Sequence, residues 1–195
     1  MKNLLMLFMA LGIFSVTQAQ TQTSNFRISW SVAIPTGDLS DYIGETSLRG
    51  GSLEYNWRPK PNLEVGIESG WNLLYERADD KVYTYETASV SGVQYRYTNT
   101  IPIIAGVKML GKAKSGLIPY GGVGLGTVYI NRNTDFGLYR ITNNTWQFSV
   151  RPELGLRYDY QPGKGIILGA KYYLNSANDE LGAQSYVAIN LGLVF

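Results

Sequence analysis

The residues best suited to chemistry in this chain are acids and bases that recur at every second position. Between residues 146 and 160, alternate positions carry Arg151, Glu153, Arg157 and Asp159. Residues two apart in a β-strand point to the same face, so these ionic side chains should share one face of a strand. Carboxylates facing arginines can support acid–base catalysis, or they can form a buried network of ion pairs.

An ion-pair network explains the charges on several other predicted strands as well. Positive and negative side chains nearly balance on the polar faces of these strands, so they can neutralise one another inside a narrow lumen. The predicted members of the network are Glu64, Glu68, Arg96, Arg151, Glu153, Arg157, Asp159 and Lys171. Arg27, Glu54 and Lys108 lie on the same polar faces but outside the predicted centre of the network.

The composition argues against catalysis and against a bound cofactor. The chain has no His, the commonest general base and metal ligand, and no Cys, which excludes disulfides and thiolate metal sites. A paired-carboxylate site at Glu64 and Glu68 stays open as an alternative, as does a cation site at Asp79, Asp80 or Asp135 in the predicted loops. We expect solvated charges in those loops, and we predict no enzymatic activity, no metal and no cofactor.

Two further classes of ligand fit the sequence poorly. The glycines at alternate positions of residues 122–126 are not followed by a helical pattern, whereas a dinucleotide site needs G-x-G-x-x-G between a strand and a helix. These glycines are better explained by a strand whose inner face must be small. The formal charge of +2 is low and the basic residues are scattered, so we expect no nucleic-acid partner.

Alternating apolar and polar residues predict eight β-strands. The expected strands are Asn25–Pro35, Ser47–Trp57, Leu63–Tyr75, Val93–Leu110, Leu117–Asn131, Trp146–Tyr160, Ile166–Asn175 and Gln184–Phe195. Long loops (36–46, 76–92, 132–144 and 176–182) alternate with short turns (58–61, 111–116 and 161–164). The even count and this asymmetry are typical of membrane barrels. We therefore predict an all-β fold, an eight-stranded antiparallel up-and-down transmembrane β-barrel with both termini at the short-turn end.

The apolar face of the strands should point outward. A soluble lipocalin-like barrel would also show the alternation, but with its apolar face inward. Here the apolar face carries all four Trp, and the interior of an eight-stranded barrel is too narrow for so bulky a set. Aromatic residues also gather towards both ends of the strands, as in the two interfacial girdles of a membrane barrel. We therefore expect lipid against the apolar face.

Residues 1–19 have the organisation of a secretory signal peptide. Lys2 precedes an apolar stretch from Leu4 to Val16, and Thr17 and Ala19 supply small residues before the expected cleavage site. An N-terminal membrane anchor is the alternative, but this stretch is short for a helical span, which needs about 20 residues. We expect cleavage after Ala19, which leaves residues 20–195 as one barrel domain.

Four stretches of the sequence resemble a known family. They are WSVAIPTGDL at 30–39, TIPIIAGVK at 100–108, PYGGVGLG at 119–126 and the terminal GLVF at 192–195. The mature chain is similar to small bacterial outer-membrane β-barrel proteins such as the OmpA transmembrane domain, OmpX and OmpW, and within that group to the outer membrane protein beta-barrel domain family. The resemblance implies an outer-membrane location with periplasmic termini. It also implies that the barrel-assembly machinery recognises the last strand through Phe195, whose other expected role is that of an interfacial anchor.

The expected function follows from a plugged lumen, which would leave specificity to the outer loops. We predict a structural, adhesion or docking protein of the envelope, with an extracellular or envelope protein as a partner of the loops. The resemblance to OmpW implies the alternative, a narrow pore or transporter for small solutes. We expect the protein to be a monomer surrounded by outer-membrane lipid.

Overall fold

The computed structural model describes residues 24–85, 88–161 and 163–195, and side chains outside residues 79–91. The expected signal peptide, residues 1–19, therefore lies outside the described residues. The elements in chain order are β1 (Asn25–Pro35), α2 (Asp38–Tyr42), β2 (Gly50–Lys60), β3 (Leu63–Tyr85), β4 (Ala88–Leu110), β5 (Leu117–Phe136), β6 (Tyr139–Gln161), β7 (Lys164–Asn175) and β8 (Tyr186–Val194). No helix among the described residues is long and apolar enough to cross a membrane.

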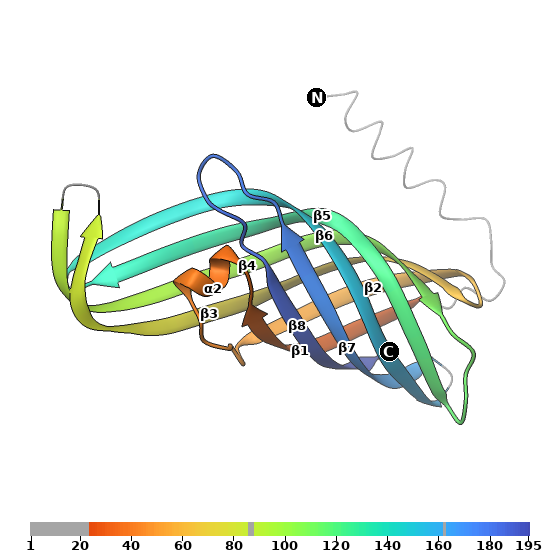
Figure 1. The fold of residues 1–195 in the computed structure, drawn as a ribbon. Coiled ribbons are helices and arrows are strands. Elements are labelled where there is room, and N and C mark those ends of the chain that lie inside the picture. Colours follow the sequence, from red (N-terminus) through yellow and green to blue (C-terminus); the bar gives the residue numbers. More distant parts are fainter. Residues whose placement is uncertain (1–23, 86–87, 162) are drawn as a thin grey trace, which may run out of the picture.

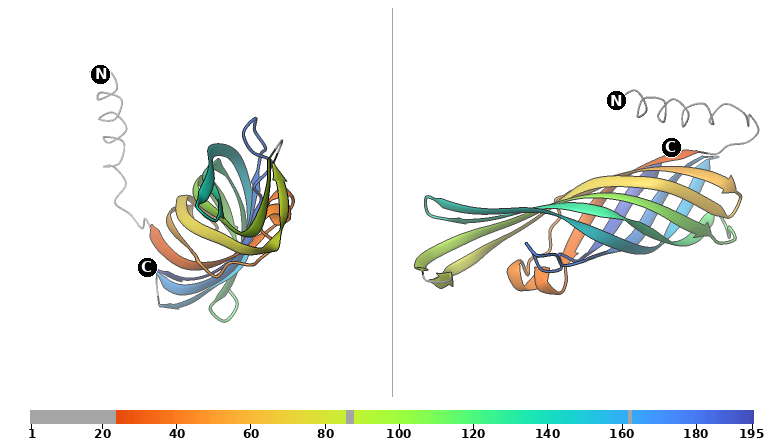
Figure 2. Two further views of the ribbon diagram at one scale, coloured as in Figure 1. Left: turned by 90° about the vertical axis from the view of Figure 1, so that its left-hand side faces the viewer. Right: turned by 90° about the horizontal axis from the view of Figure 1, so that it is seen from above.

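The eight strands form a closed barrel in sequence order (Figures 1 and 2). Each strand pairs antiparallel with its neighbours, and β1 closes the ring by pairing with β8. Closure leaves neither of these two strands with an unpaired edge, which a membrane interior would penalise. The predicted all-β, eight-stranded antiparallel barrel is confirmed.

The alternation of side chains along the strands sorts the two faces as the sequence predicts. All four Trp lie on the outside, with exposed fractions between 42% and 54%. The inner face holds buried polar and charged side chains or glycine; Arg27 and Arg151 are each only 1% exposed. An exposed apolar belt around a buried polar interior is the arrangement expected of a barrel in lipid.

Two of the predicted loops are wrong, because the strands continue through them. The sequence predicts irregular loops at residues 76–92 and 132–144, but β3 pairs with β4 as far as Tyr85 and Ala88, and β5 pairs with β6 as far as Phe136 and Tyr139. These segments are rich in polar residues, so the apolar alternation fades although the backbone ladder persists. Gly137 (φ 59°) takes the first central position of a two-residue hairpin turn, where glycine is favoured.

The lumen is divided into two layers along its axis. Its outer part is filled by an apolar cluster into which the short helix α2 inserts Leu39 and, just after it, Ile43, both fully buried. The other members are Ala33, Tyr42, Leu74, Ile104, Val128, Ile130, Tyr173, Leu181, Tyr186 and Ala188. The polar layer lies between this cluster and the short turns. The helix therefore helps to fill the lumen at the end that carries the long loops, which we call the wide end.

The first and last strands meet at the short-turn end (Figure 1). The Phe26 amide donates to the Phe195 carbonyl at 3.0 Å, and the Phe195 amide donates to the Phe26 carbonyl at 2.8 Å. Both ends of the barrel domain therefore leave from the same rim, next to the turns that join β2 to β3 and β6 to β7.

Candidate functional site

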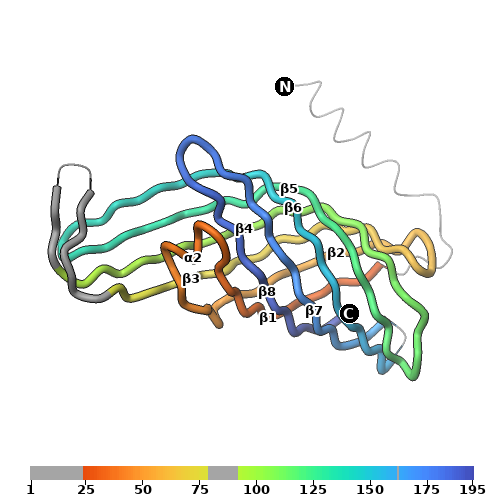
Figure 3. The backbone as a smooth tube through the Cα atoms, viewed as in Figure 1, coloured from red at the N-terminus to blue at the C-terminus, as the bar shows by residue number. Residues whose placement is uncertain are grey.

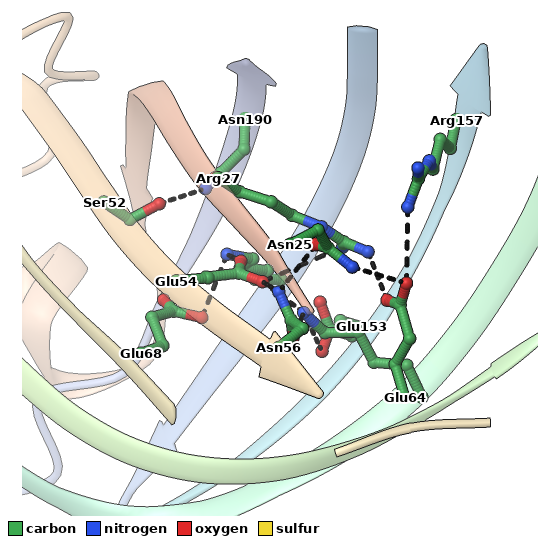
Figure 4. Close-up of polar contacts among 12 residues, drawn as sticks. Asn25, Arg27, Ser52, Glu54, Asn56, Glu64, Glu68, Glu153, Arg157 and Asn190 are labelled. Carbon is green, nitrogen blue, oxygen red and sulfur yellow. Dashed lines mark hydrogen bonds and ion pairs between the residues drawn. The ribbon is translucent and has the colours of Figure 1, made fainter. Parts of the chain in front are cut away.

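The candidate site is the polar layer of the lumen, where ionic side chains from six strands converge (Figure 4). The alternation of each strand directs these side chains inward, and glycines on the neighbouring strands leave them room. Its buried charged members are Arg27, Glu54, Glu64, Glu68, Lys108, Arg151, Glu153, Arg157 and Lys171, all at most 5% exposed. We call this set, together with Arg58 and Asp159 at its rim, the lumen network.

Glu64 is the most heavily contacted acid of the lumen network. Its Oε1 accepts hydrogen bonds from Arg58 Nη2 at 2.6 Å, Asn25 Nδ2 at 3.0 Å and Arg157 Nη1 at 3.3 Å. Its Oε2 accepts from Arg27 Nη2. A fully buried carboxylate is stable only when it is paired in this way, so Glu64 ties β1, β2 and β6 to β3.

A second cluster forms around two carboxylates that lie directly opposite each other on β2 and β3. Glu54 and Glu68 are cross-strand partners, a like-charge pair that would be repulsive by itself. Lys171 on β7 offsets this repulsion by pairing with both acids: its Nζ contacts Glu54 Oε1 and lies 2.9 Å from Glu68 Oε2. Lys108 from β4 supplies a further cation to Glu54.

Arg151 connects the remaining acids. Its guanidinium pairs with Glu68, and its Nη2 donates to Glu153 at 2.6 Å along the same strand. Glu68 also accepts a hydrogen bond from the hydroxyl of Tyr173, whose ring stacks on Tyr186 at 4.6 Å in the apolar cluster. The two layers of the lumen are therefore joined by a direct hydrogen bond.

The packing of the lumen network leaves little free space. The void among Glu54, Glu68, Lys108 and Arg151 has no room for a water-sized sphere. Charges held this tightly favour a fixed plug, because each acid already lies against one or more cations. Catalysis by Glu64 and Glu68 as a carboxylate pair would require both acids to leave their cations, and the two acids belong to different clusters.

Most of the sequence-predicted residues meet in the lumen network. Those that do are Glu64, Glu68, Arg151, Glu153, Arg157, Asp159 and Lys171. Asp159 lies at the rim, with its side chain 24% exposed and bonded to Arg157. The structure thus brings together residues that lie far apart in the sequence.

Arg96 does not join these residues, and its predicted place in the network is wrong. Its Nη1 donates to the Tyr42 carbonyl at 2.8 Å and its guanidinium lies 5.1 Å from the centre of the Tyr42 ring. Arg96 pairs across the sheet with Glu76 and Thr134, near the wide end, whereas Lys108 on the same strand pairs with Glu64. Alternation sets which face a side chain takes, but the strand register sets its height.

The predicted centre of the network omits three of its central members. The alternation places Arg27, Glu54 and Lys108 on polar faces, and this is the signal in the sequence that points to them. Their pairing depends on contacts between β1, β2 and β4, for example Lys108 Nζ with Glu54 and Asn56, which no single strand pattern contains.

Phe195 lies away from the lumen network. Phe195 is 53% exposed on the outside of the barrel at the short-turn rim. Its recognition by the assembly machinery stays a prediction.

Within the described residues, no group of three or more His, Cys, Asp or Glu side chains is arranged to hold a metal ion.

Several solved structures with a similar fold are small outer-membrane β-barrels. Neisserial surface protein A matches with a TM-score of 0.60 and 11% identity, over 90% of this chain and 98% of that one. The Escherichia coli outer membrane protein W matches with a TM-score of 0.51 and 10% identity, over 91% and 99%. The Yersinia pestis attachment invasion locus protein Ail, in complex with the heparin analogue sucrose octasulfate, matches at 0.50 and 14%, over 88% and 97%.

These similarities concern the fold, since the identities are low, and no curated protein matches the chain. The family comparison covers almost the entire sequence: the model of the outer membrane protein beta-barrel domain matches residues 6–195. The closed eight-stranded ring, the apolar exterior and the ionic interior agree with that match. The chain therefore belongs to the outer membrane protein beta-barrel domain family.

Proposed function

We propose that this outer membrane protein is a non-conducting, non-enzymatic barrel that docks another protein through a sheet projecting from its wide end. The observation that carries the proposal is the unequal length of the strands (Figure 2). β2 accompanies β3 only as far as Asn72, and β7 accompanies β6 only from Ser149. Beyond these points β3, β4, β5 and β6 continue as a four-stranded sheet.

The outer edge of β6 is open to a further strand. Within the described residues, no strand pairs with Tyr139–Asn144 on the side away from β5. Tyr139 and Phe136 close a two-residue hairpin as a hydrogen-bonded pair, so the amides of Arg140, Thr142 and Asn144 point away from β5. An extended peptide that binds such an edge gains main-chain hydrogen bonds, and the alternate side chains give specificity.

The tip of the projecting sheet adds apolar contact area beside that edge. Leu138 is fully exposed and Tyr139 is 73% exposed, and Tyr139 stacks on Phe136 at 6.2 Å. These residues border a hollow of about 580 Å³ that Val93 and Tyr95 complete. Exposed aromatic residues beside an open strand edge are typical of protein-binding surfaces.

A photo-cross-linking experiment tests the docking edge. With a photoreactive amino acid at Asn144, cells carrying the protein in their outer membrane should yield a discrete protein adduct after irradiation. Thr142→Pro removes an outward amide and should abolish the adduct, because the partner strand loses a main-chain bond. Thr142→Val keeps the amide and the β-branched shape, so the adduct should persist. An adduct that survives Thr142→Pro, or the absence of any adduct, would contradict docking by strand addition.

The alternative function is a narrow pore for small solutes, and the lumen argues against it. The ionic layer leaves no room for water among Glu54, Glu68, Lys108 and Arg151, and the apolar cluster with α2 closes the wide end. We expect the purified protein in a planar lipid bilayer to show no steady single-channel conductance. A large, stable conductance step would contradict the plug and favour the transport function.

The same arrangement supports an orientation in the outer membrane. We propose that the projecting sheet faces the cell exterior and that the short turns, with both termini, face the periplasm. Short turns on the periplasmic side are usual for such barrels. In this orientation the exposed ring of Phe195 lies where the barrel-assembly machinery would meet the last strand. We also propose that the protein is a monomer in the membrane.

A further inference from the structure

A groove crosses the outer surface of the barrel over β5, β6, β7 and β8. Its volume is about 550 Å³, and it lies on the apolar face of the strands. Its apolar walls are formed by Pro119, Leu154, Leu156, Leu168, Ala170 and Ile189. It lies on the opposite face of the sheet from the lumen network, and it plays no part in the proposed docking edge.

The strand register explains why the surface is hollow at this place. Leu154 lies between Gly121 on β5 and Ala170 on β7, so a bulky outward side chain is flanked by two small ones. The adjacent cross-strand pair, Gly155 and Gly169, forms the floor of the groove, and the Tyr120 side chain covers this pair from the lumen side. A Cβ atom at Gly169 would lie 2.5 Å from the Tyr120 hydroxyl oxygen, so the floor cannot gain a side chain unless Tyr120 moves.

The groove ends at a basic rim. Two turns flank the last residues of β6 there: the Asp159 amide donates to the Gly116 carbonyl at 3.1 Å, and Lys164 pairs with Gln161 (Figure 3). Lys112 and Lys114 in the first turn and Lys164 in the second are exposed. Among the described residues, no carboxylate forms an ion pair with any of these three lysines.

We propose that this groove binds an acyl chain of an anionic glycerophospholipid whose phosphate lies beside Lys114 and Lys164. Charge complementarity selects an anionic headgroup, since the described part of the chain supplies no acidic partner for the lysines near the groove. The distance along β6 between the turns and the groove also fits this occupant. Tyr158 lies at the level of the turns, and Leu156 of the groove is two residues further along the strand, about 7 Å away at about 3.3 Å per residue. A phosphate level with the turns therefore places the first methylene groups of the chain at the groove.

Aromatic residues at the rim fit the same occupant. Tyr158 and Tyr160, on the outward face of β6, are 47% and 52% exposed. Tyrosine at this depth combines an apolar ring with a hydroxyl that reaches the headgroups. The barrel thus offers one lipid a chain site, an aromatic interface and two cations on a single surface.

Native mass spectrometry tests the proposal with the full barrel released from detergent that contains equal amounts of phosphatidylglycerol and phosphatidylethanolamine with identical chains. We expect one phosphatidylglycerol to be retained in clear preference. Lys114→Gln and Lys164→Gln should each lower its retention about fivefold, as expected for one lysine near an anionic headgroup. Lys60→Gln removes the same charge at the β2–β3 turn and should leave retention unchanged.

A second pair of variants separates the groove from the charges. Ala170→Leu fills the groove and should reduce retention of phosphatidylglycerol, whereas Ala105→Leu makes the same change on the outward face of β4, away from the groove, and should have no effect. Equal retention of both lipids by the wild type, or an equal loss with Lys60→Gln, would overturn the proposal. A lipid-free dimer that Ala170→Leu abolishes would also overturn it, because the groove would then be a contact between two copies of the chain.

Discussion

Glu64→Gln should lower the free energy of unfolding by about 3–5 kcal/mol, the usual cost of removing one partner from a buried ion pair. Glutamine keeps the shape of the side chain but not its charge. Arg27 and Arg157, both buried, would then face a neutral amide. Urea unfolding of the protein in phospholipid vesicles, followed by tryptophan fluorescence, measures the change.

Two further variants establish that the loss arises from buried charge. Glu45→Gln removes an exposed carboxylate in the segment between α2 and β2 and should change stability by less than about 0.5 kcal/mol. Glu64→Gln combined with Arg27→Met should cost less than the sum of the single variants, since the second change removes a stranded cation. If Glu64→Gln and Glu45→Gln had the same small effect, the lumen network would not be the source of stability that its geometry indicates.

Leu191→Arg should destabilise the barrel in lipid by about 2–4 kcal/mol, because it places a charge on the lipid face near the middle of β8. Leu191 is 51% exposed on the outside and lies between Trp30 and Leu168 on the neighbouring strands. The same vesicle unfolding experiment gives the magnitude. The size of the loss tests whether the apolar face of β8 meets lipid. It tests the same assignment for the other strands, because they share the alternation of β8.

The matched control for Leu191→Arg is the same substitution at the hairpin tip. Leu138 is equally apolar and fully exposed, but it belongs to the projecting sheet. Leu138→Arg should therefore change stability by no more than about 0.5 kcal/mol. A large loss at Leu138 with none at Leu191 would reverse the assignment of which surface meets lipid.

The architecture could be predicted from the sequence because a barrel in lipid repeats one physical requirement on every strand. Apolar side chains such as Trp30 and Leu191 must face outward while Arg27 or Glu54 faces inward, and this alternation is visible one strand at a time. The alternation fails where the strands no longer need an apolar face toward lipid. Beyond Tyr75 the strands leave the apolar belt, and residues 132–144 look irregular although they continue the ladder.

The site was only partly predictable, because its contacts cross from strand to strand. The polar face of each strand could be identified, but whether Arg96 or Lys108 lies level with Glu64 depends on the register between β3 and β4. Helix α2 was missed for another reason. Leu39, Tyr42 and Ile43 have the three- and four-residue spacing of an apolar helical face, a signal that was present inside a segment interpreted as a polar loop.

The partners of the buried acids constrain how the barrel can insert into the membrane. Arg27 is supplied by the first strand and Arg157 by the sixth, while Lys171, which separates Glu54 from Glu68, comes from the seventh. A chain that entered the bilayer one hairpin at a time would carry uncompensated ions into hydrocarbon until the later hairpins arrived. Each partial product would be more costly than either the exported chain or the finished cylinder. Insertion of this protein should therefore be concerted, with the interior charges neutralised only as the seam between β1 and β8 is sealed.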